Sequence, residues 1–426
     1  MNSQVILTES PSRLRWVAVL AVGLSLFLSA LDSTIVALAL PEIANRFQVS
    51  NSLVAGVTLS YAIPLTLLVL PAGALIGRFR SLHLFIASVL GFGISSVACG
   101  LAPNFPMLVA ARAVQGSFAA IIATQGLALA AAVVLPQERG RAMGVIGTVA
   151  PLGGVVGPGV GGILLASYDW SSIFFVNLPI VLIASVLGFL SLRAVVLRGS
   201  GAPSQASNHM VSLLRNPSFL SGLVAFFFSV SASVALYYFL PFDLSGIHHV
   251  SPALSGLLLL CVPLGMVSIG VASGYLTDRY HARPFVLAGS GMLFIGSIAL
   301  SLVVSASTSE LDLAWRLFLI GVGVGLFTGP NMSVIMNIGG REKIASASAI
   351  SNLAGRLASV VGPLAVGVVW TLIPTFSGQM TIGILLVVVF AAATLLFAFL
   401  SGRGDRGTFK DSIDLTLKNH EPRKLR

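Results

Sequence analysis

The stretch Val155-Val156-Gly157-Pro158, followed by Gly162, returns in the second half of the chain as Val360-Val361-Gly362-Pro363, followed by Gly367. The two copies are 205 residues apart. Two unrelated patterns repeat at 201 and 204 residues: Gly73-Ala74-Leu75 with Arg78 returns as Gly274-Tyr275-Leu276 with Arg279, and Arg112 returns as Arg316. Three patterns that agree on one period indicate an internal duplication, and repeated halves of this size are typical of secondary transporters.

The composition indicates a membrane protein. Of 426 residues, 56% are hydrophobic and 9% are charged, whereas soluble domains carry about 25% charged residues. The net charge of +10 could suggest a nucleic-acid partner, but bases that bind nucleic acid cluster on one face with stacking aromatics. Here they lie in the gaps between apolar runs. We therefore expect the lipid bilayer as a partner and no nucleic acid.

About twelve apolar runs are long enough to cross a bilayer, since a span needs about 20 residues. The first run is too long for the core of a signal peptide, so it is interpreted as a retained helix. The predicted runs are 16–40, 53–74, 82–102, 106–135, 142–166, 172–193, 217–241, 253–276, 284–305, 313–338, 345–372 and 380–401.

A segment rich in glycine and serine separates the sixth run from the seventh, and it is predicted to be a flexible linker. The chain then divides into a six-helix half at 1–195, a linker at 196–216, a second six-helix half at 217–401 and a basic tail at 402–426. The expected fold class is an all-α membrane protein that crosses the bilayer many times.

The basic residues predict the orientation. With the N-terminus in the cytoplasm, 20 of the 24 Lys and Arg residues fall on that side, as the positive-inside rule requires. The connections on the other side hold one base, Arg46, and the acids Glu42, Asp169, Asp243, Glu310 and Asp312. We expect a protein of the cell membrane with both termini in the cytoplasm.

Asp32 and Arg112 lie inside apolar runs. At 1.5 Å per residue, Asp32 is roughly 13 Å, and Arg112 roughly 9–12 Å, below the outer end of its helix, so the two are expected at matching depth. A charged side chain in a span costs about 2.5–3.5 kcal/mol unless it is paired or hydrated. Each residue is therefore either part of a functional site or half of a structural ion pair. Arg316 can extend to the membrane surface or pair with the nearby acids Glu310 and Asp312, and Arg356 can be a site residue or a structural partner.

Gly153, Gly157 and Gly161 are four residues apart, so they are predicted to share one helical face and to let a neighbouring helix approach closely. Pro158 removes a backbone donor and bends the helix. The four residues are predicted to form a hinge or a seal, although small residues in membrane helices are often simply packing.

Enzymatic and nucleotide-driven readings have little support. The histidines lie in connections or at the ends of runs, and neither they nor the two cysteines have metal-binding spacing, so no metal and no cofactor are expected. His248-His249 on the outer side could bind a metal, sense pH or stand there by chance. No Walker-type loop is present, which leaves an ion gradient as the energy source. A proton gradient suits a lone buried carboxylate.

Three segments resemble motifs of the drug:proton antiporters of the major facilitator superfamily. They are Leu31 to Pro41 (LDSTIVALALP), Arg112 to Ala120 (RAVQGSFAA) and Gly153 to Gly162 (GGVVGPGVGG). The resemblance implies the major facilitator fold, with about twelve helices in two six-helix halves that alternate access to the two sides. It also implies that Asp32 carries the proton or senses a cationic substrate, with Arg112 and Gln115 tuning it. A monomer is expected.

The loop motif of that family is present in both halves, at Gly73 with Arg78 and at Gly274 with Asp278 and Arg279. In the first copy, Gly77 stands where the family usually has aspartate. In the family this carboxylate helps to latch the two halves together on the cytoplasmic side. The resemblance therefore predicts a weaker latch here, or one that other groups supply.

We expect proton-coupled export of small amphipathic or cationic molecules. One alternative is transport of a defined polar metabolite, for which Asn331, Asn352 and Arg356 could provide hydrogen bonds in a cavity of the second half. The other alternative is a membrane receptor that keeps the fold without transporting.

Overall fold

The computed structural model describes residues 12–75, 79–193, 205–303, 309–338 and 340–401, and these residues form helices and short connections without a strand. The first half contains α1 (Ser12–Phe47), α2 (Asn51–Leu75), α3 (Ser81–Gly100), α4 (Phe105–Ala132), the short 3₁₀ helix η1 (Pro136–Glu138), α5 (Arg139–Ser167), α6 (Ser172–Phe175) and α7 (Asn177–Ser191). The second half contains α9 (Pro217–Gly246), α10 (Pro252–Arg279), α11 (Ala282–Ser301), α12 (Glu310–Ile338), α13 (Gly340–Thr371) and α14 (Phe376–Ser401).

Twelve spans in the described part of the chain are long and apolar enough to cross a membrane, which confirms the predicted number. The sixth span is divided at Val176 into α6 and α7. Residues 196–204 of the predicted linker lie outside the described residues, whereas Gln205–Leu214 form helix α8, which packs against α13 and α9. A glycine- and serine-rich composition favours flexibility, but Leu213 of α8 finds a hydrophobic cluster in which to be buried.

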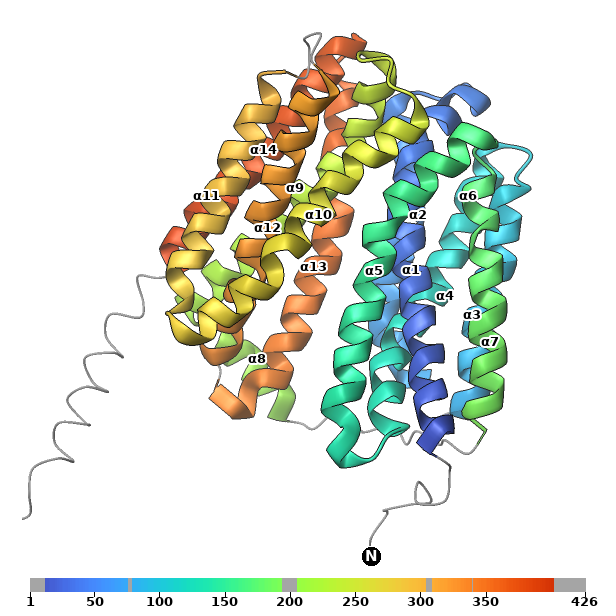
Figure 1. Ribbon diagram of the computed structural model, residues 1–426, viewed down its shortest axis with the longest axis vertical. Coiled ribbons are helices and arrows are strands. Elements are labelled where there is room, and N and C mark those ends of the chain that lie inside the picture. The colour runs from blue at the N-terminus through green and yellow to red at the C-terminus, as the bar shows by residue number, and fades with distance from the viewer. Residues whose placement is uncertain (1–11, 76–78, 194–204, 304–308, 339, 402–426) are drawn as a thin grey trace, which may run out of the picture.

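Corresponding helices pack in the same way in the two halves (Figure 1). In the first half α1 packs on α5 and α2 on α4, and in the second half α9 packs on α13 and α10 on α12. The connection after the first helix of each half contains a residue with positive φ, Gln48 at 53° and His249 at 51°, which are 201 residues apart. Two residues later, Ser50 and Ser251 accept hydrogen bonds from the backbone at the start of α2 and α10. These equivalences confirm the duplication.

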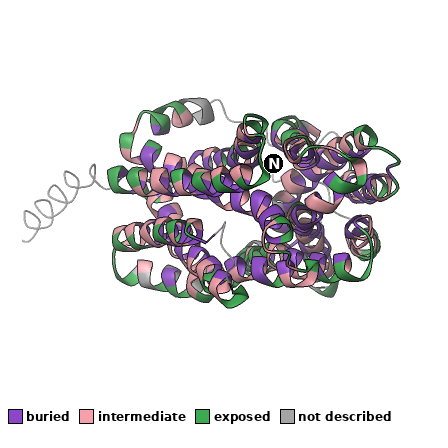
Figure 2. Cartoon of the chain, turned by 90° about the horizontal axis from the view of Figure 1, so that it is seen from above, coloured by how far each residue is buried: buried purple, intermediate pink, exposed green. Residues whose placement is uncertain are grey.

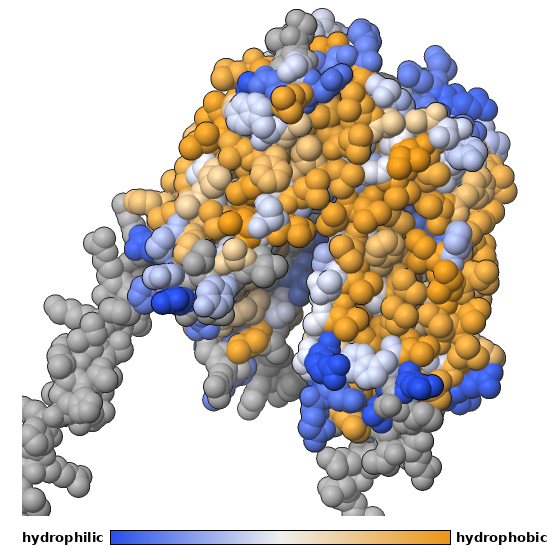
Figure 3. Space-filling model, in the orientation of Figure 1, coloured by the Kyte–Doolittle hydropathy of each residue, from blue (hydrophilic) through white to orange (hydrophobic). Residues whose placement is uncertain are grey.

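Large apolar side chains are exposed around the girth of the molecule, while polar residues gather at its two ends (Figure 3). Seen from above, buried residues lie on the sides of the helices that face one another, and exposed residues lie around the rim (Figure 2). A continuous exposed apolar belt is unsuitable for water, where such patches stay small. The surface therefore matches a bilayer.

The halves are in contact at one end of the molecule and apart at the other. Figure 3 shows a hollow between them that opens on the face from which α1 and α5 start, which we call the open face. Among the described residues outside this stretch of α5, no atom lies within 4 Å of the point where a Cβ would stand on Gly140, Gly144 or Gly147. At the opposite end, the closed face, a Cβ on Gly162 of α5 would lie 2.9 Å from Gly256 Cα of α10. This arrangement is that of a protein with access from one side.

Two hydrogen bonds link the halves at the closed face. Asn51 at the start of α2 donates from Nδ2 to Gln379 Oε1 of α14 over 3.2 Å. Its carbonyl oxygen accepts a 2.7 Å hydrogen bond from the Tyr238 hydroxyl of α9. Both bonds have to break, or be exchanged for water, when this face opens.

Candidate functional site

Asp32 of α1 and Arg112 of α4 form an ion pair inside the first half, with 2.6 Å between Asp32 Oδ2 and Arg112 Nη1. Their side chains are 0% and 1% exposed. The expected match in depth is confirmed, because a direct contact of this kind requires it. A buried pair with good geometry offsets much of the desolvation cost of its two charges, whereas either charge left alone is strongly destabilising.

Gln115, one turn after Arg112 on α4, closes a triangle with the pair. Its Oε1 accepts a 2.7 Å hydrogen bond from Arg112 Nη1, and its Nε2 donates to Asp32 Oδ1 over 3.0 Å. Residues three apart on a helix are neighbours on its surface, so Arg112 and Gln115 present their polar groups to α1 together. All three residues predicted as the coupling site are thus brought into contact.

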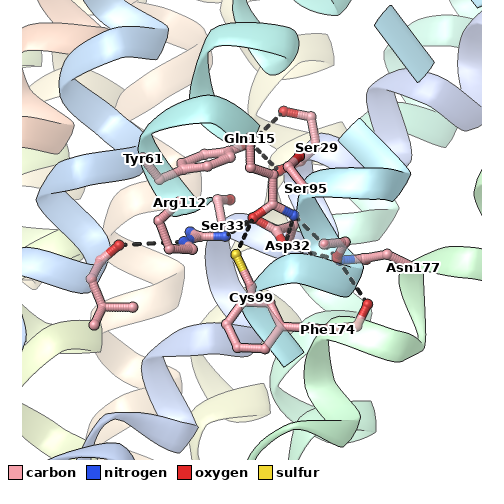
Figure 4. A network of polar contacts seen from close by, with 12 residues as sticks. Ser29, Asp32, Ser33, Tyr61, Ser95, Cys99, Arg112, Gln115, Phe174 and Asn177 are labelled. Carbon is pink, nitrogen blue, oxygen red and sulfur yellow. Dashed lines mark hydrogen bonds and ion pairs between the residues drawn. The ribbon is translucent and has the colours of Figure 1, made fainter. Parts of the chain in front are cut away.

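Two further polar residues complete the group, and sequence reasoning missed both (Figure 4). Asn177 Nδ2 donates to Asp32 Oδ1 over 3.0 Å and to Ser96 Oγ over 2.9 Å. Ser96 Oγ also accepts from Gln115 Nε2 and donates to the carbonyl oxygen of Phe174. We call Asp32, Arg112, Gln115, Asn177 and Ser96 the Asp32 network.

The division between α6 and α7 explains the position of Asn177, which is the first residue of α7. The Phe174 carbonyl at the end of α6 accepts a hydrogen bond from Ser96, so the break in the helix supplies both an acceptor and a side chain to the network. A lone asparagine within an apolar run was the available signal, since a polar side chain at membrane depth needs a partner.

Aromatic rings enclose the guanidinium group. Arg112 Cζ lies 4.3 Å from the ring centroid of Tyr61 and 5.8 Å from that of Phe174. Arg112 Nε donates to the carbonyl oxygen of Val57 over 3.3 Å, and the Tyr61 hydroxyl lies 2.9 Å from Ser29 Oγ. A cation over an aromatic face gains more when it is desolvated, so α2 helps to hold the charge in place.

The Asp32 carboxylate has three donors, from Arg112, Gln115 and Asn177. Asp32 is wholly buried, so its carboxylate can reach water only if these donors and their helices move. The neighbouring residue on α1, Ser33, is exposed. α1 is therefore exposed one residue along the chain from Asp32, while the carboxylate itself is covered.

Three residues were proposed to line a cavity in the second half. In the structure described, no hydrogen bond connects one of them to another. Asn331 of α12 is buried and donates to the Gly222 carbonyl of α9 over 3.1 Å. Asn352 of α13 is exposed and bonds within its own helix, to Ser348. Arg356 is half-buried, and its carbonyl oxygen accepts a 3.4 Å hydrogen bond from Thr66 of the other half. Among these three residues, Arg356 is the one with a hydrogen bond to the other half in the structure described.

The glycines of α5 do share one face, as predicted, and that face packs on α1. A Cβ on Gly161 would lie 2.9 Å from Ile35 Cγ1, and one on Gly153 or Gly157 would collide with the backbone of Phe27 or the hydroxyl of Thr34. The Pro158 carbonyl points the other way, because a Cβ on Gly256 of α10 would lie 2.5 Å from it. The three glycines thus pack within the first half, and Pro158 contacts the second.

The loop motif lies at the open face. Gly73 is in α2, while Arg78 lies outside the described residues. The backbone of Gly274 and Asp278 belongs to α10, which ends at Arg279, and the Arg279 guanidinium carbon lies 5.7 Å from the Tyr280 ring centroid. Nothing in these positions tests the expected latch.

Arg316, the sequence counterpart of Arg112, has a different environment. It pairs with Asp312 one turn earlier on α12, with 2.8 Å between Nη2 and Oδ2. The pair is half-buried at the closed face, so the second half contains no copy of the Arg112 ion pair at this position. Among the described residues, no group of three or more His, Cys, Asp or Glu side chains could hold a metal ion.

Comparison with known proteins shows the family. A model of the Major Facilitator Superfamily matches residues 22–363. The riboflavin transporter RibZ of Clostridioides difficile is 26% identical over 76% of this chain and 81% of its own length. The multidrug resistance protein Stp of Mycobacterium tuberculosis is 28% identical over 82% of this chain and 75% of its own. The puromycin resistance protein pur8 of Streptomyces alboniger is 28% identical over 83% and 81%.

Solved structures confirm the fold. A bacterial homolog of the human lysosomal transporter Spinster, crystallised in an inward-facing and occupied conformation, superposes with a TM-score of 0.78 at 18% identity. The same homolog in its inward-facing and unoccupied conformation gives a TM-score of 0.75 at 17% identity. Both comparisons cover 92% of this chain and 98% of the other.

Proposed function

This chain belongs to the major facilitator superfamily and is a transporter, and we propose that it exports small amphipathic or cationic compounds in exchange for protons. The observation that carries the proposal is Asp32, a wholly buried carboxylate held by Arg112, Gln115 and Asn177. A charge at membrane depth is functional by default. Removal of one donor by a change in helix packing would let this carboxylate accept a proton.

The proposed cycle uses the two faces in turn. In the conformation described, the hollow between the halves admits a substrate from the open face. Opening of the closed face, by separation of α5 from α10 and α2 from α13, would release the substrate on the other side. Proton binding at Asp32 would weaken its hold on Arg112 and favour the return. Export follows if the open face is cytoplasmic.

We place the open face in the cytoplasm and the protein in the cell membrane. Arg80, Arg139, Arg141, Arg215 and Arg283 lie at that end of the described helices, and positive residues favour the cytoplasmic side. Both termini then lie in the cytoplasm, and the acids Glu42, Glu310 and Asp312 lie outside.

The names of two relatives, a multidrug resistance protein and a puromycin resistance protein, support drug export as the substrate class. The riboflavin transporter supports a second candidate, transport of a defined polar metabolite. Arg356 favours that candidate as well, because it is half-buried at the junction of the halves. A panel of puromycin, cationic dyes and riboflavin, tested with purified protein in proteoliposomes, separates the two classes.

The first prediction tests Asp32 directly. Asp32→Asn keeps the size of the side chain but removes the titrating group, so substrate-dependent proton flux should fall to the level of protein-free liposomes. The measurement is the change in internal pH on addition of puromycin under an imposed pH gradient. Glu310→Gln, an exposed acid at the closed face, is the matched control and should transport normally.

Asp32→Asn leaves Arg112 as an unpaired buried charge, which costs about 3–5 kcal/mol of stability. The double variant Asp32→Asn with Arg112→Gln removes both charges and should recover folded yield while staying inactive. Full proton flux in folded Asp32→Asn protein would contradict the assignment of Asp32 as the coupling group.

A further inference from the structure

A second buried acid lies far from the Asp32 network. Asp243 is in the last turn of α9, at the closed face, and its side chain is 0% exposed. The sequence placed it in an outer connection, but α9 continues to Gly246 and carries it into the protein. Neither of its carboxyl oxygens has a hydrogen-bond partner among the described residues.

The titratable group that faces Asp243 is a histidine from the connection to α10. His248 Nε2 lies 3.5 Å from Asp243 Oδ2, and the His248 side chain is 4% exposed. Like the carboxyl oxygens, this nitrogen has no hydrogen-bond partner in the described part of the chain. The two buried groups therefore face each other, and neither has a hydrogen-bond partner among the described residues.

Among the described residues, no charged group other than His248 forms an ion pair with the Asp243 carboxylate. α9 packs against α14, α13, α1, α12 and α10, and at its other end against α8. α14 and the part of α13 beyond Arg356 contain no titratable side chain. None of the following titratable groups at this end forms a hydrogen bond or ion pair with Asp243 in the structure described: Glu42, Arg46, Tyr237, Tyr238, His249, Cys261, Glu310, Asp312 and Arg316.

The duplication supplies a comparison within the same molecule. Glu42 on α1 lies 201 residues before Asp243, the offset that also relates Gln48 to His249. Glu42 has a partner, because its Oε1 accepts a 3.1 Å hydrogen bond from the Trp170 backbone. Asp243 occupies the equivalent position but has no hydrogen-bond partner among the described residues. Its protonation state therefore depends on His248, the titratable group that faces it.

The pair adjoins the contact between the halves. A pocket of about 390 Å³ lies there, bounded by Pro41 and Glu42 of α1 and by Phe242 and Ser245 of α9. Asp243 follows Phe242, and one turn earlier on α9 the Tyr238 hydroxyl bonds to Asn51 of the first half. Movement of this end of α9 therefore acts on the closed face directly.

We propose that Asp243 and His248 form a proton-binding site in the closed face, and that this face stays shut when the pair holds one proton. With one proton the pair is neutral overall, whether the proton lies on the carboxyl or the imidazole. Loss of that proton leaves a single buried negative charge, and gain of a second leaves a single buried positive charge. Either charge is better solvated when the face opens.

The closed face is therefore most stable at intermediate pH. Burial lowers the pKa of His248, so the imidazole stays neutral through its ordinary value of about 6.5 and acquires a charge only at lower pH, where the closed face loses stability. On the alkaline side the closed face loses stability when the last proton leaves. The site responds to the pH outside the cell and is independent of proton coupling at Asp32.

The test measures opening of the closed face without substrate or gradient. In a background of Cys99→Ala and Cys261→Ala, spin labels at Leu53→Cys and Ser377→Cys, both exposed, report the separation of the halves in nanodiscs from about pH 5 to about pH 9. We expect a closed fraction that is greatest at intermediate pH. The ratio of closed to open should change at most tenfold per pH unit on each side, because one proton is involved on each.

Three variants assign the two sides of this profile. Asp243→Asn should abolish the alkaline fall, and His248→Gln should abolish the acid fall. Glu42→Gln, at the repeat-related position, should keep both. If the Asp243→Asn variant does not fold, the pH profile of the His248→Gln variant is sufficient for the test. This variant is expected to fold, because His248 lies in the connection between α9 and α10 and not within a helix. A wild-type profile in either variant, or a flat profile in the unmodified protein, would overturn the proposal.

Discussion

The two buried acids Asp32 and Asp243 differ in their hydrogen-bond partners. The Asp32 carboxylate has three donors, one of which is the guanidinium group of Arg112, whereas Asp243 faces one histidine at 3.5 Å. Hydrogen bonds to charged groups contribute about 1.5–3 kcal/mol each. Each donor of the Asp32 network is therefore expected to make a measurable contribution to the stability of the protein.

Asn177 allows that share to be measured. Asn177→Ala removes one donor from Asp32 without changing charge, so we expect a loss of about 1.5–3 kcal/mol in stability and a fall in transport rate. Thermal unfolding in detergent and transport in proteoliposomes are the measurements. Gln125→Ala is the matched control, since Gln125 is buried in the same half and bonds to Ser88 over 2.7 Å without touching Asp32.

The Gln125 variant should lose less stability, about 0.5–1.5 kcal/mol, because its hydrogen bond is neutral. Equal losses of stability and of transport rate in the two variants would argue against a special role for Asn177.

Helix α5 has two close-packed faces. One face, at Gly157 and Gly161, contacts α1 within the first half, and the other, at Gly159 and Gly162, contacts α10 of the second half. Close approach of this kind depends on missing side chains. The first contact holds a half together in every conformation, whereas the second has to separate when the closed face opens.

Substitution on the two faces should therefore have different effects. Gly162→Val places methyl groups against Pro252 and Gly256, so the protein should fold but show a larger open fraction at the closed face, by the spin-label measurement. Gly157→Val forces α1 away from α5 and should reduce the yield of folded protein. The same loss of yield in both variants would mean that the two contacts are equally structural.

At the scale of the whole molecule, two copies of one six-helix plan enclose a hollow that is open at the basic end (Figures 1 and 3). Across the junction α5 contacts α10, and α2 contacts α13. Because α5 corresponds to α13 and α2 to α10 in the duplication, the two contacts are equivalent. Rocking about such a junction opens one face as it closes the other.

The orientation is tested with a membrane-impermeant thiol reagent on whole cells. In the background without cysteines, Ser377→Cys at the closed face should be labelled in intact cells. Gly140→Cys at the open face should be labelled only after the cells are permeabilised, because basic residues there favour the cytoplasm. Labelling of Gly140→Cys in intact cells, with Ser377→Cys protected, would reverse the direction of transport.

The spans, the duplication and the matching depth of Asp32 and Arg112 could be predicted from the amino-acid sequence, because they depend on local hydrophobicity and on distance along a helix. Three contacts became visible only in the folded molecule: Asn177 with Asp32, Gly162 of α5 with Gly256 of α10, and Asp243 with His248. Those contacts join residues far apart in the chain or on either side of a turn. They depend on how side chains of particular shape and polarity fit together, which no single segment encodes.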